Sequence, residues 1–505
     1  MNDMIAVLLA IFSFALQWAH GVTEQPNIIF ILADDLGYFD VGYREGSIVK
    51  TPNIDKLAAE GVKLERYYAQ SSCMPSRSCL MMGRYQIHTG FDYRCLDGQL
   101  TRLCMAPDTV TLPMKLRQYG YATHMIGKWH LGHERKECVP THKGFDTFFG
   151  YHGAAENYYT HTALGRPRCH DLWRNMENVA EDYDGQYSTL FYTKEAQDII
   201  KNHDKKKPFF MYLSYQAVHG PLEVPSNYRM PYYTSGVDES RQIYAAMATC
   251  MDEGIGNITE TLKASGMLNN TILVFSSDNG AQFHTGGRNW PLRGGKGTMW
   301  EGGVRVLAFV NSPLLKKSRT VNHEMIHTSD WFPTFVRLAG GTVDDVELDG
   351  VDQWDTISTG APTKRQELLI QISGRRGALE DIGKDPWITN DYFDITRAAS
   401  IIVGRWKLVT GQYRSPKTWV PPPELNYPED HIMPPSTEIL GKMVWLFDLE
   451  EDQNEKNDLS SCRPEIVIKL LKRLRDYYSH SVFCGSSSYS PNCAQRGNQW
   501  GPYDL

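Results

Sequence analysis

The pattern of hydrophobic residues predicts alternating strands and helices over the first two thirds of the chain. "PNIIFILADD" at 26–35 and "TILVFSSDNG" at 271–280 are short apolar runs that end in acidic residues, which is typical of strands buried on both faces of a parallel sheet. Helical spacing predicts helices over 51–68 and 192–203, and strand character resumes at 207–219. The alternation from Pro26 to about Gly340 indicates an α/β domain with a mainly parallel sheet, with ligands expected at the carboxyl ends of its strands.

The pattern changes after about residue 360. Residues 360–395 are polar and aperiodic and residues 420–435 are rich in proline, so we expect a junction and a long loop. Runs at 399–411 and 442–452 alternate as strands, and one face of a helix over 464–478 is apolar, made of Val467, Leu470, Leu471, Leu474 and Tyr478. These runs predict a small C-terminal domain at 391–505, with an antiparallel sheet and one helix, after a large α/β domain at 22–390.

Length, composition and charge narrow the class of protein. A chain of 505 residues is too long for one hydrophobic core, and 41% hydrophobic with 22% charged residues is typical of a folded globular protein. The net charge of −7 argues against a nucleic-acid binder. The apolar run 4–18, followed by Ala19 and Gly21, predicts a signal peptide over 1–21 in preference to a buried N-terminal helix. No other run approaches the ~20 apolar residues that span a bilayer.

The ten cysteines fit the export that a signal peptide predicts. In an exported chain they favour disulfides over free thiols. The tripeptides that begin at Asn257 and Asn269 are acceptor sequences for N-glycosylation, which also occurs in the secretory pathway. We therefore expect a protein of the secretory pathway that is secreted or lysosomal.

Two acidic pairs follow predicted strands. Asp34 and Asp35 come directly after the first strand, and Asp278 and Asn279 come directly after a later one. Because parallel strands end at the same edge of a sheet, the four side chains could bring oxygen ligands to one hard cation. Calcium takes such ligands, whereas zinc prefers His or Cys. Each pair alone also fits an ordinary turn or helix cap.

Several basic side chains lie near predicted strand ends. Lys128 and His130 are two residues apart in "GKWHLG", which places them on one face of an extended segment. His219 follows a strand, and Lys296 lies in a glycine-rich loop. Singly, a histidine there is more often structural and a loop lysine more often solvated. Together with Arg77 and a divalent ion they predict a cationic pocket for a tetrahedral oxyanion ester, either phosphate or sulfate.

Cys73 decides between the two esters. In "SSCMPSRSCLMMGR" at 71–84 it could be half of a disulfide, a metal ligand or a nucleophile. The series "CMPSR" with "GRYQIHTG" resembles the sulfatase signature, in which the cysteine is oxidised to formylglycine during secretion. The likeness continues through "PNIIFILADDLGYFDVGY", "GKWHLG", "YQAVHGPLEVP", "FSSDNGAQ" and "NWPLRGGKGTMWEGGVR". The chain thus resembles the sulfatase family, especially the arylsulfatase B, I and J group.

The resemblance implies an alkaline-phosphatase-like catalytic domain and hydrolysis of sulfate esters on sulfated sugars, glycosaminoglycan ends or aryl sulfates. It implies a formylglycine at position 73, made by the formylglycine-generating enzyme. It further implies one calcium ion, with five ligand residues: Asp34, Asp35, Asp278, Asn279 and the modified residue 73.

The resemblance also implies roles for the basic residues. Arg77 would stabilise the formylglycine hydrate, which attacks the sulfur, and Lys128 and His130 would support its turnover. His219 and Lys296 would hold the sulfate and assist the leaving oxygen. The disulfides that it implies are Cys104–Cys138 and Cys95–Cys493.

Two alternatives remain at this point. A phosphomonoesterase or phosphodiesterase would be expected to carry Ser or Thr in place of Cys73, and zinc-binding His clusters are absent from the acidic pairs. A non-catalytic binder of sulfated glycans would keep Cys73 as a thiol. Met82 favours the binder, because it stands where the family commonly has Thr.

Overall fold

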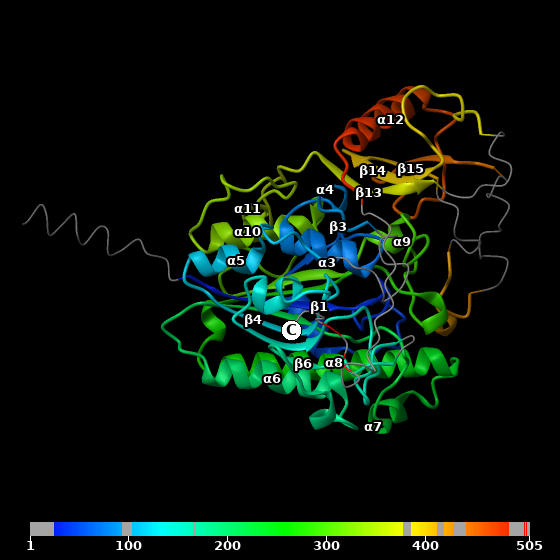
Figure 1. Cartoon of the computed structure of the whole chain (residues 1–505). Helices are drawn as coiled ribbons and strands as arrows, with labels where there is room; N and C mark the ends of the chain where they lie inside the picture. The colour runs from blue at the N-terminus through cyan, green and yellow to red at the C-terminus, as the bar shows by residue number, and fades with distance from the viewer. Residues whose placement is uncertain are drawn as a thin grey trace, which may run out of the picture.

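Two sheets carry the fold of the computed structural model (Figure 1). The structure describes residues 25–92, 104–164, 168–376, 385–411, 419–427 and 441–483, with Gln499 and Gly501. The predicted signal peptide at 1–21 and the predicted disulfide Cys95–Cys493 lie outside these residues. Within them, no helix combines the length and the apolar character needed to cross a membrane.

The large sheet has ten strands in the order β11-β2-β10-β9-β1-β8-β4-β5-β6-β7. Its central strands β9, β1, β8, β4 and β5 are parallel to their neighbours in this group, whereas β10, β6 and β7 pair antiparallel. The prediction of a mainly parallel sheet is confirmed. The strands are β1 (Asn27–Ala33), β2 (Val62–Leu64), β4 (Ala122–Lys128), β5 (Thr147–Tyr151), β6 (Trp173–Arg174), β7 (Glu177–Asn178), β8 (Phe209–Ser214), β9 (Thr271–Ser277), β10 (Ala308–Asn311) and β11 (Thr320–Asn322). A separate pair joins β3 (Tyr67–Tyr68) to β12 (Ile326–His327).

Helices cover both faces of the large sheet (Figure 1). Ile29 and Ile31 of β1 lie in the core shared with α6 and α8, and Ile28 and Phe30 lie in the core shared with α3, α5 and α10. This alternation follows from the period of two in a strand, so β1 is apolar on both faces. The helices are α2 (Pro52–Glu60), α3 (Cys73–Met82), α4 (Gln86–Thr89), α5 (Leu112–Gln118), α6 (Ser188–Asn202), α7 (Ser226–Arg229), α8 (Glu239–Ala264), α9 (Glu301–Val304), α10 (Trp331–Leu338), α11 (Trp354–Thr359) and α12 (Pro464–Ser479).

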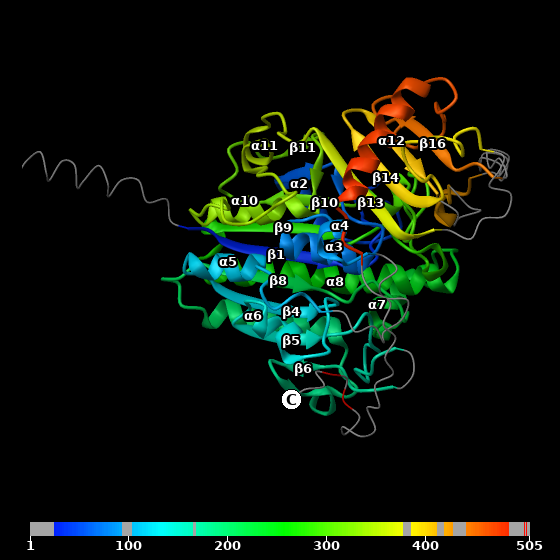
Figure 2. The same cartoon turned by 45° about the horizontal axis from the view of Figure 1, so that its top comes forward.

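The second sheet is antiparallel and packs against one helix, as predicted (Figure 2). Its order is β13 (Glu367–Arg376), β14 (Arg397–Val403), β15 (Trp406–Thr410) and β16 (Val444–Asp448). Val467, Leu470, Leu471 and Leu474 of α12 are buried in its core. The prediction of a junction and a long loop over 360–395 is wrong at Glu367–Arg376, which form β13. The division of the chain into domains at 390 stays a prediction.

The predicted helix over 51–68 is also wrong beyond its first half. α2 ends at Glu60, and the Gly61 N–H donates to the Leu57 carbonyl. Val62 and Leu64 then face inward in β2, which pairs with β10 and β11. Edge pairing in the large sheet thus overrides the helical spacing of the apolar residues.

One predicted disulfide falls within the described residues and is confirmed. Cys104 and Cys138 are bonded, with their Cα atoms 5.2 Å apart. Cys73, Cys79, Cys250 and Cys462 are free. The interpretation of Cys73 as half of a disulfide is therefore wrong.

The register of the central strands aligns their carboxyl ends. Ala33 at the end of β1 pairs with Ser277 at the end of β9, and Gly127 of β4 pairs with Ser214 of β8. Gly127 has φ 91°, and a Cβ built there would lie 1.9 Å from the Ser214 carbonyl oxygen. Only glycine therefore allows β4 to approach β8 at the residue before Lys128.

We predict that Gly127→Ala destabilises the fold by at least ~3 kcal/mol, because backbone overlap adds to the strain of a positive φ. Gly266→Ala is the matched control, and it should cost about 1 kcal/mol. Gly266 has φ 71°, and a Cβ built there would meet no atom of the described chain within 4 Å beyond its immediate neighbours. Urea unfolding measures both. Equal losses would contradict the close approach of the two strands.

Candidate active site

The two predicted acidic pairs meet at the carboxyl edge of the large sheet. Asp34 follows β1 and Asp278 follows β9, and the Asp278 N–H donates to the Ala33 carbonyl at 3.1 Å. The Asp35 N–H donates to Asp278 Oδ1 at 3.2 Å, and Asn279 Nδ2 donates to Asp35 Oδ1 at 2.7 Å. All four side chains are buried. The structure therefore brings together the four oxygen-bearing residues that the sequence analysis selected.

Arg77 and Lys128 lie against these acids and are fully buried. Arg77 Nη2 is 2.7 Å from Asp278 Oδ2 and 3.5 Å from Asp34 Oδ2. Lys128 Nζ is 2.5 Å from Asp34 Oδ2. Arg77 also donates from Nη1 to the Lys128 carbonyl at 3.1 Å and to Ser214 Oγ at 2.5 Å. The guanidinium is thus held in one orientation by groups at four strand ends, those of β1, β4, β8 and β9.

The carboxyl groups respond differently to this environment. Burial raises the pKa of Asp34, but the neighbouring cations, first Lys128 and then His219, hold it well below its usual value. For Asp278, burial and the charge of Asp34 raise the pKa to about 6, although Arg77 lowers it. Asp278 is therefore a carboxylate that further positive charge would stabilise.

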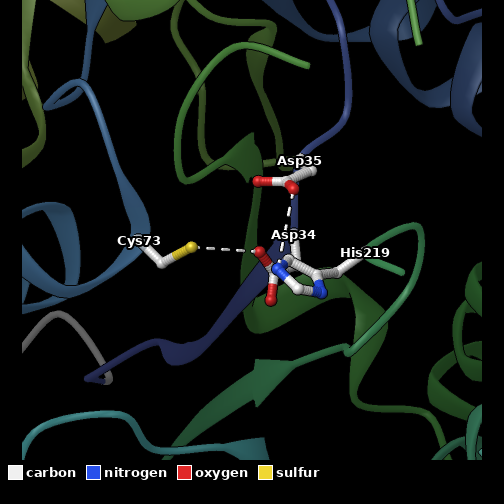
Figure 3. A group of neighbouring side chains, drawn as sticks. All are labelled: Asp34, Asp35, Cys73 and His219. Carbon is white, nitrogen blue, oxygen red and sulfur yellow. Dashed lines mark hydrogen bonds and ion pairs between the residues drawn. The ribbon is translucent and has the colours of Figure 1, made fainter. Parts of the chain in front are cut away.

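Cys73 is the first residue of α3 and points toward Asp34 (Figure 3). Its Sγ lies 3.4 Å from Asp34 Oδ1. Burial and the negative charges of Asp278 and Asp34 raise the pKa of its thiol to about 12. Because the thiolate is the reactive form of cysteine, this environment disfavours Cys73 itself as a nucleophile.

His130 lies in a conformation that differs from the prediction. β4 ends at Lys128, and His130 has φ 57°, so the segment is not extended there. Its N–H donates to the His152 carbonyl, and both its ring nitrogens are buried without a hydrogen-bond partner in the described part of the chain. Burial and the charges of Lys128 and Arg77 hold the pKa of His130 well below its usual value. The ring is therefore neutral, with one of its two nitrogens unprotonated.

Lys296 and His219 both face Asp35. Lys296 Nζ is 2.6 Å from Asp35 Oδ1, and His219 Nε2 is 3.7 Å from Asp35 Oδ2. Nδ1 of His219 lies 2.7 Å from the Gly220 carbonyl, so this nitrogen carries the hydrogen. Burial and the charge of Lys296 lower the pKa of His219. Nε2 can therefore donate only when the ring takes up a second proton, which acidic conditions favour.

The donor atoms fit a hard cation. Ligand atoms of Asp34, Asp35, Cys73 and His219 all lie within 4.8 Å of one another (Figure 3). Oδ1 of Asn279 is buried and has no hydrogen-bond partner among the described residues. An amide turned by 180° would present this oxygen beside Asp35. Carboxylates with a spare amide oxygen suit calcium better than zinc, and an oxygen in place of the Cys73 sulfur would suit it better still.

The sequence analysis missed three contacts of the site. Ser214 and Tyr212 of β8 face Arg77, with the Tyr212 hydroxyl 3.4 Å from Arg77 Nη1. Gln371 of β13 accepts from Ser71 Oγ at 2.6 Å, two residues before Cys73. The alternation along β8 could have suggested Ser214, since it ends a buried strand. Nothing in the sequence near Gln371 indicates a contact 300 residues away.

Comparison with known proteins identifies the family of the chain. Residues 26–341 match the family model described as Sulfatase. The chain belongs to the sulfatase family. Arylsulfatase J of Mus musculus is 46% identical to this sulfatase over 494 residues, which cover 95% of this chain and 81% of that protein. N-acetylgalactosamine-6-sulfatase of Homo sapiens is 33% identical over 366 residues, which cover 68% of this chain and 67% of that protein.

Solved structures agree with the fold of this sulfatase. Ps i-CgsB in complex with k-i-k-neocarrahexaose matches with a TM-score of 0.75 and 26% identity, over 94% of this chain and 96% of that chain. The phosphonate monoester hydrolase of Agrobacterium radiobacter matches with a TM-score of 0.58 and 18% identity, over 92% of this chain and 100% of that chain. The second likeness is one of fold alone. Because it has the sulfatase family domain and resembles named sulfatases, the chain is a sulfuric ester hydrolase, as the resemblance implied.

We predict that the unconverted chain shows very different reactivity at two of its free thiols. Iodoacetamide at mildly alkaline pH should alkylate the exposed Cys462 and leave Cys73 unmodified, because Cys73 is buried and the pKa of its thiol is raised. Peptide mass spectrometry of the folded protein measures both sites, and unfolding in urea should make both reactive. Equal alkylation in the folded chain would contradict a buried, protonated Cys73.

Proposed function

We propose that this sulfatase acts through a formylglycine made from Cys73 and through one calcium ion. The ion would be held by the carboxylates and the amide at the ends of β1 and β9, together with the modified side chain: Asp34, Asp35, Asp278, Asn279 and residue 73. The observation that carries the proposal is the place of Cys73, whose Sγ lies against Asp34 while its own thiol stays protonated. A thiol so placed is a poor nucleophile but lies where an aldehyde hydrate could act.

The formylglycine hydrate would supply the attacking hydroxyl, and the calcium ion, when bound, would supply a positive charge beside the ester. The chain's own residues would do the rest. Arg77, held by Asp278 and Ser214, keeps a fixed positive charge next to residue 73. Lys128 adds a second positive charge at Asp34 Oδ2, the oxygen that Arg77 also faces. Fixed cations in a site that excludes water stabilise developing negative charge strongly.

Proton transfer would fall to the two histidines. Both ring nitrogens of His130 lack a hydrogen-bond partner in the described part of the chain, which leaves one open to act as a general base that helps to release sulfate. His219 would donate from Nε2 to the leaving oxygen, and Lys296 would hold the equatorial sulfate oxygens. Since burial and the charge of Lys296 lower the pKa of His219, its donor form is populated under acidic conditions.

Sulfated carbohydrates, including glycosaminoglycan ends, are the proposed substrates, with aryl sulfates as synthetic ones. Two relatives support this class by name: an N-acetylgalactosamine-6-sulfatase and a structure in complex with a neocarrahexaose. We also propose that the chain meets the formylglycine-generating enzyme in the secretory pathway and that it is secreted or lysosomal. The oxidised Cys104–Cys138 pair supports this route.

Comparing two esters of one aryl alcohol tests the reaction. Sulfate release should exceed phosphate release, and Cys73→Ala should lower sulfate release by at least about a thousandfold because the nucleophile is lost. Cys462→Ala, which removes an exposed thiol, should change neither rate. Dominant phosphate release would contradict the proposal. Binding of a sulfated disaccharide without hydrolysis, unchanged by Cys73→Ala, would favour the non-catalytic binder.

Calcium removal tests the metal site. A chelator should lower the melting temperature by several degrees and calcium should restore it, since a ligand at 100 times its Kd stabilises by about 2.7 kcal/mol. Asp35→Asn should abolish the shift, and Asp344→Asn, at an exposed acid, should keep it.

The change in melting temperature on adding calcium should also depend on pH. The pKa of Asp278 is raised from 3.8 to about 6, so without the ion its contribution to stability is lost as pH rises through that range. The calcium shift should therefore be larger at neutral than at acidic pH. A shift independent of pH would contradict binding at this carboxylate.

A further inference from the structure

The loop that carries Lys296 contacts three of the segments that supply the site, those of Asp35, Cys73 and Asn279. We call residues 292–305 the lysine loop. Besides the contact of Lys296 with Asp35, the Gly297 N–H donates to the Ser71 carbonyl at 2.6 Å, two residues before Cys73. The Gly280 N–H, next to Asn279, donates to the Gly303 carbonyl at 3.0 Å. A shift of this loop would therefore move Lys296 relative to the acids.

The C-terminal sheet holds the lysine loop through a buried charge cluster. Lys407 of β15 places Nζ 2.8 Å from Glu301 Oε1 and 2.9 Å from Glu455 Oε1. All three side chains are completely buried. Oε2 of Glu455 accepts from the Glu301 N–H at 2.7 Å, at the first residue of α9. α9 lies directly below the C-terminal strands in Figure 1.

A second contact holds the other end of the lysine loop. The guanidinium of Arg293 lies 3.6 Å from the ring centre of Trp300 and 4.8 Å from that of Trp419. Trp300 in turn packs edge-on against Trp445 of β16 at 5.3 Å. The loop is therefore fixed on both sides of Lys296 by residues of the C-terminal region.

We propose that the C-terminal sheet positions the catalytic site, and that Lys407 is a positioning residue which fixes Lys296 against Asp35 through Glu301. The inference rests on the proposed role of Lys296 in binding sulfate. Removing one partner of a buried ion pair leaves an uncompensated charge, which the structure relieves by moving. A displacement of about 1 Å can cost about a hundredfold in rate.

Hydrogen exchange tests the positioning without reference to hydrolysis. In Lys407→Met, amides of residues 292–305 should exchange at least about tenfold faster, because Glu301 loses its nearer counter-charge at 2.8 Å and keeps Arg305 at 3.8 Å. Lys442→Met is the control: Lys442 pairs with Asp458 at 2.9 Å in the same region, and its loss should leave the loop unchanged. Unchanged exchange in Lys407→Met would overturn the inference.

A double-mutant cycle tests whether the effect reaches Lys296. Lys407→Met should lower kcat/KM for an aryl sulfate about ten- to a hundredfold. Lys296→Met with Lys407→Met should be no worse than Lys296→Met alone, because both remove one interaction. Losses that multiply would show a separate, structural role and would overturn the inference.

A second variant tests the inference if Lys407→Met does not fold. Lys407→Met with Glu455→Gln replaces both side chains of the Lys407–Glu455 pair by uncharged ones, so it should fold while its lysine loop still exchanges fast. Slow exchange in this variant would overturn the inference. A different result would contradict the proposed function itself: Lys296→Met alone would leave kcat/KM unchanged.

Discussion

The balance of charge at the ends of β1 and β9 is the constraint on which the rest of the structure depends. Asp34, Asp35 and Asp278 are buried at one point, where isolated carboxylates would be very unfavourable. Each is matched by a cation from another segment. α3 provides Arg77, β4 ends at Lys128 and the lysine loop supplies Lys296. A divalent ion would add to a site that is already neutral, and so would give it the positive charge that a sulfate ester requires.

The same buried environment explains why Cys73 is unreactive as a thiol. Burial and then the negative charges of Asp278 and Asp34 raise the pKa of its thiol, so the residue is unreactive in the form in which the ribosome makes it. An aldehyde at this place carries no charge of its own, and its hydrate adds oxygen to a set of ligands that already favours calcium. The chemistry we propose therefore follows from the site's electrostatics as well as from the family to which the chain belongs.

Much of the fold could be predicted because strands such as β1 and β9 are short, mostly apolar and buried. The acids after β1 and β9 were found by their position after such runs, and the parallel register then places Asp34 beside Asp278. Contacts between distant segments could not be found in this way. β13 was missed because its flanks are polar, and Lys407 resembles any lysine of an alternating strand although it is completely buried. The left-handed turn at His130 also left no mark in the residue pattern.

The two parts of the chain thus depend on each other: the large sheet gathers the acids and the C-terminal sheet holds the loop that faces them. At the centre lies the claim that residue 73 of the active protein is an aldehyde. The most direct measurement is the mass of the tryptic peptide Tyr67–Arg77 from protein secreted by a host with the converting enzyme. The account predicts a peptide lighter than the thiol form, because oxygen replaces the sulfur on Cβ of residue 73 when the aldehyde forms. A fully occupied, unmodified thiol in catalytically active protein would contradict it.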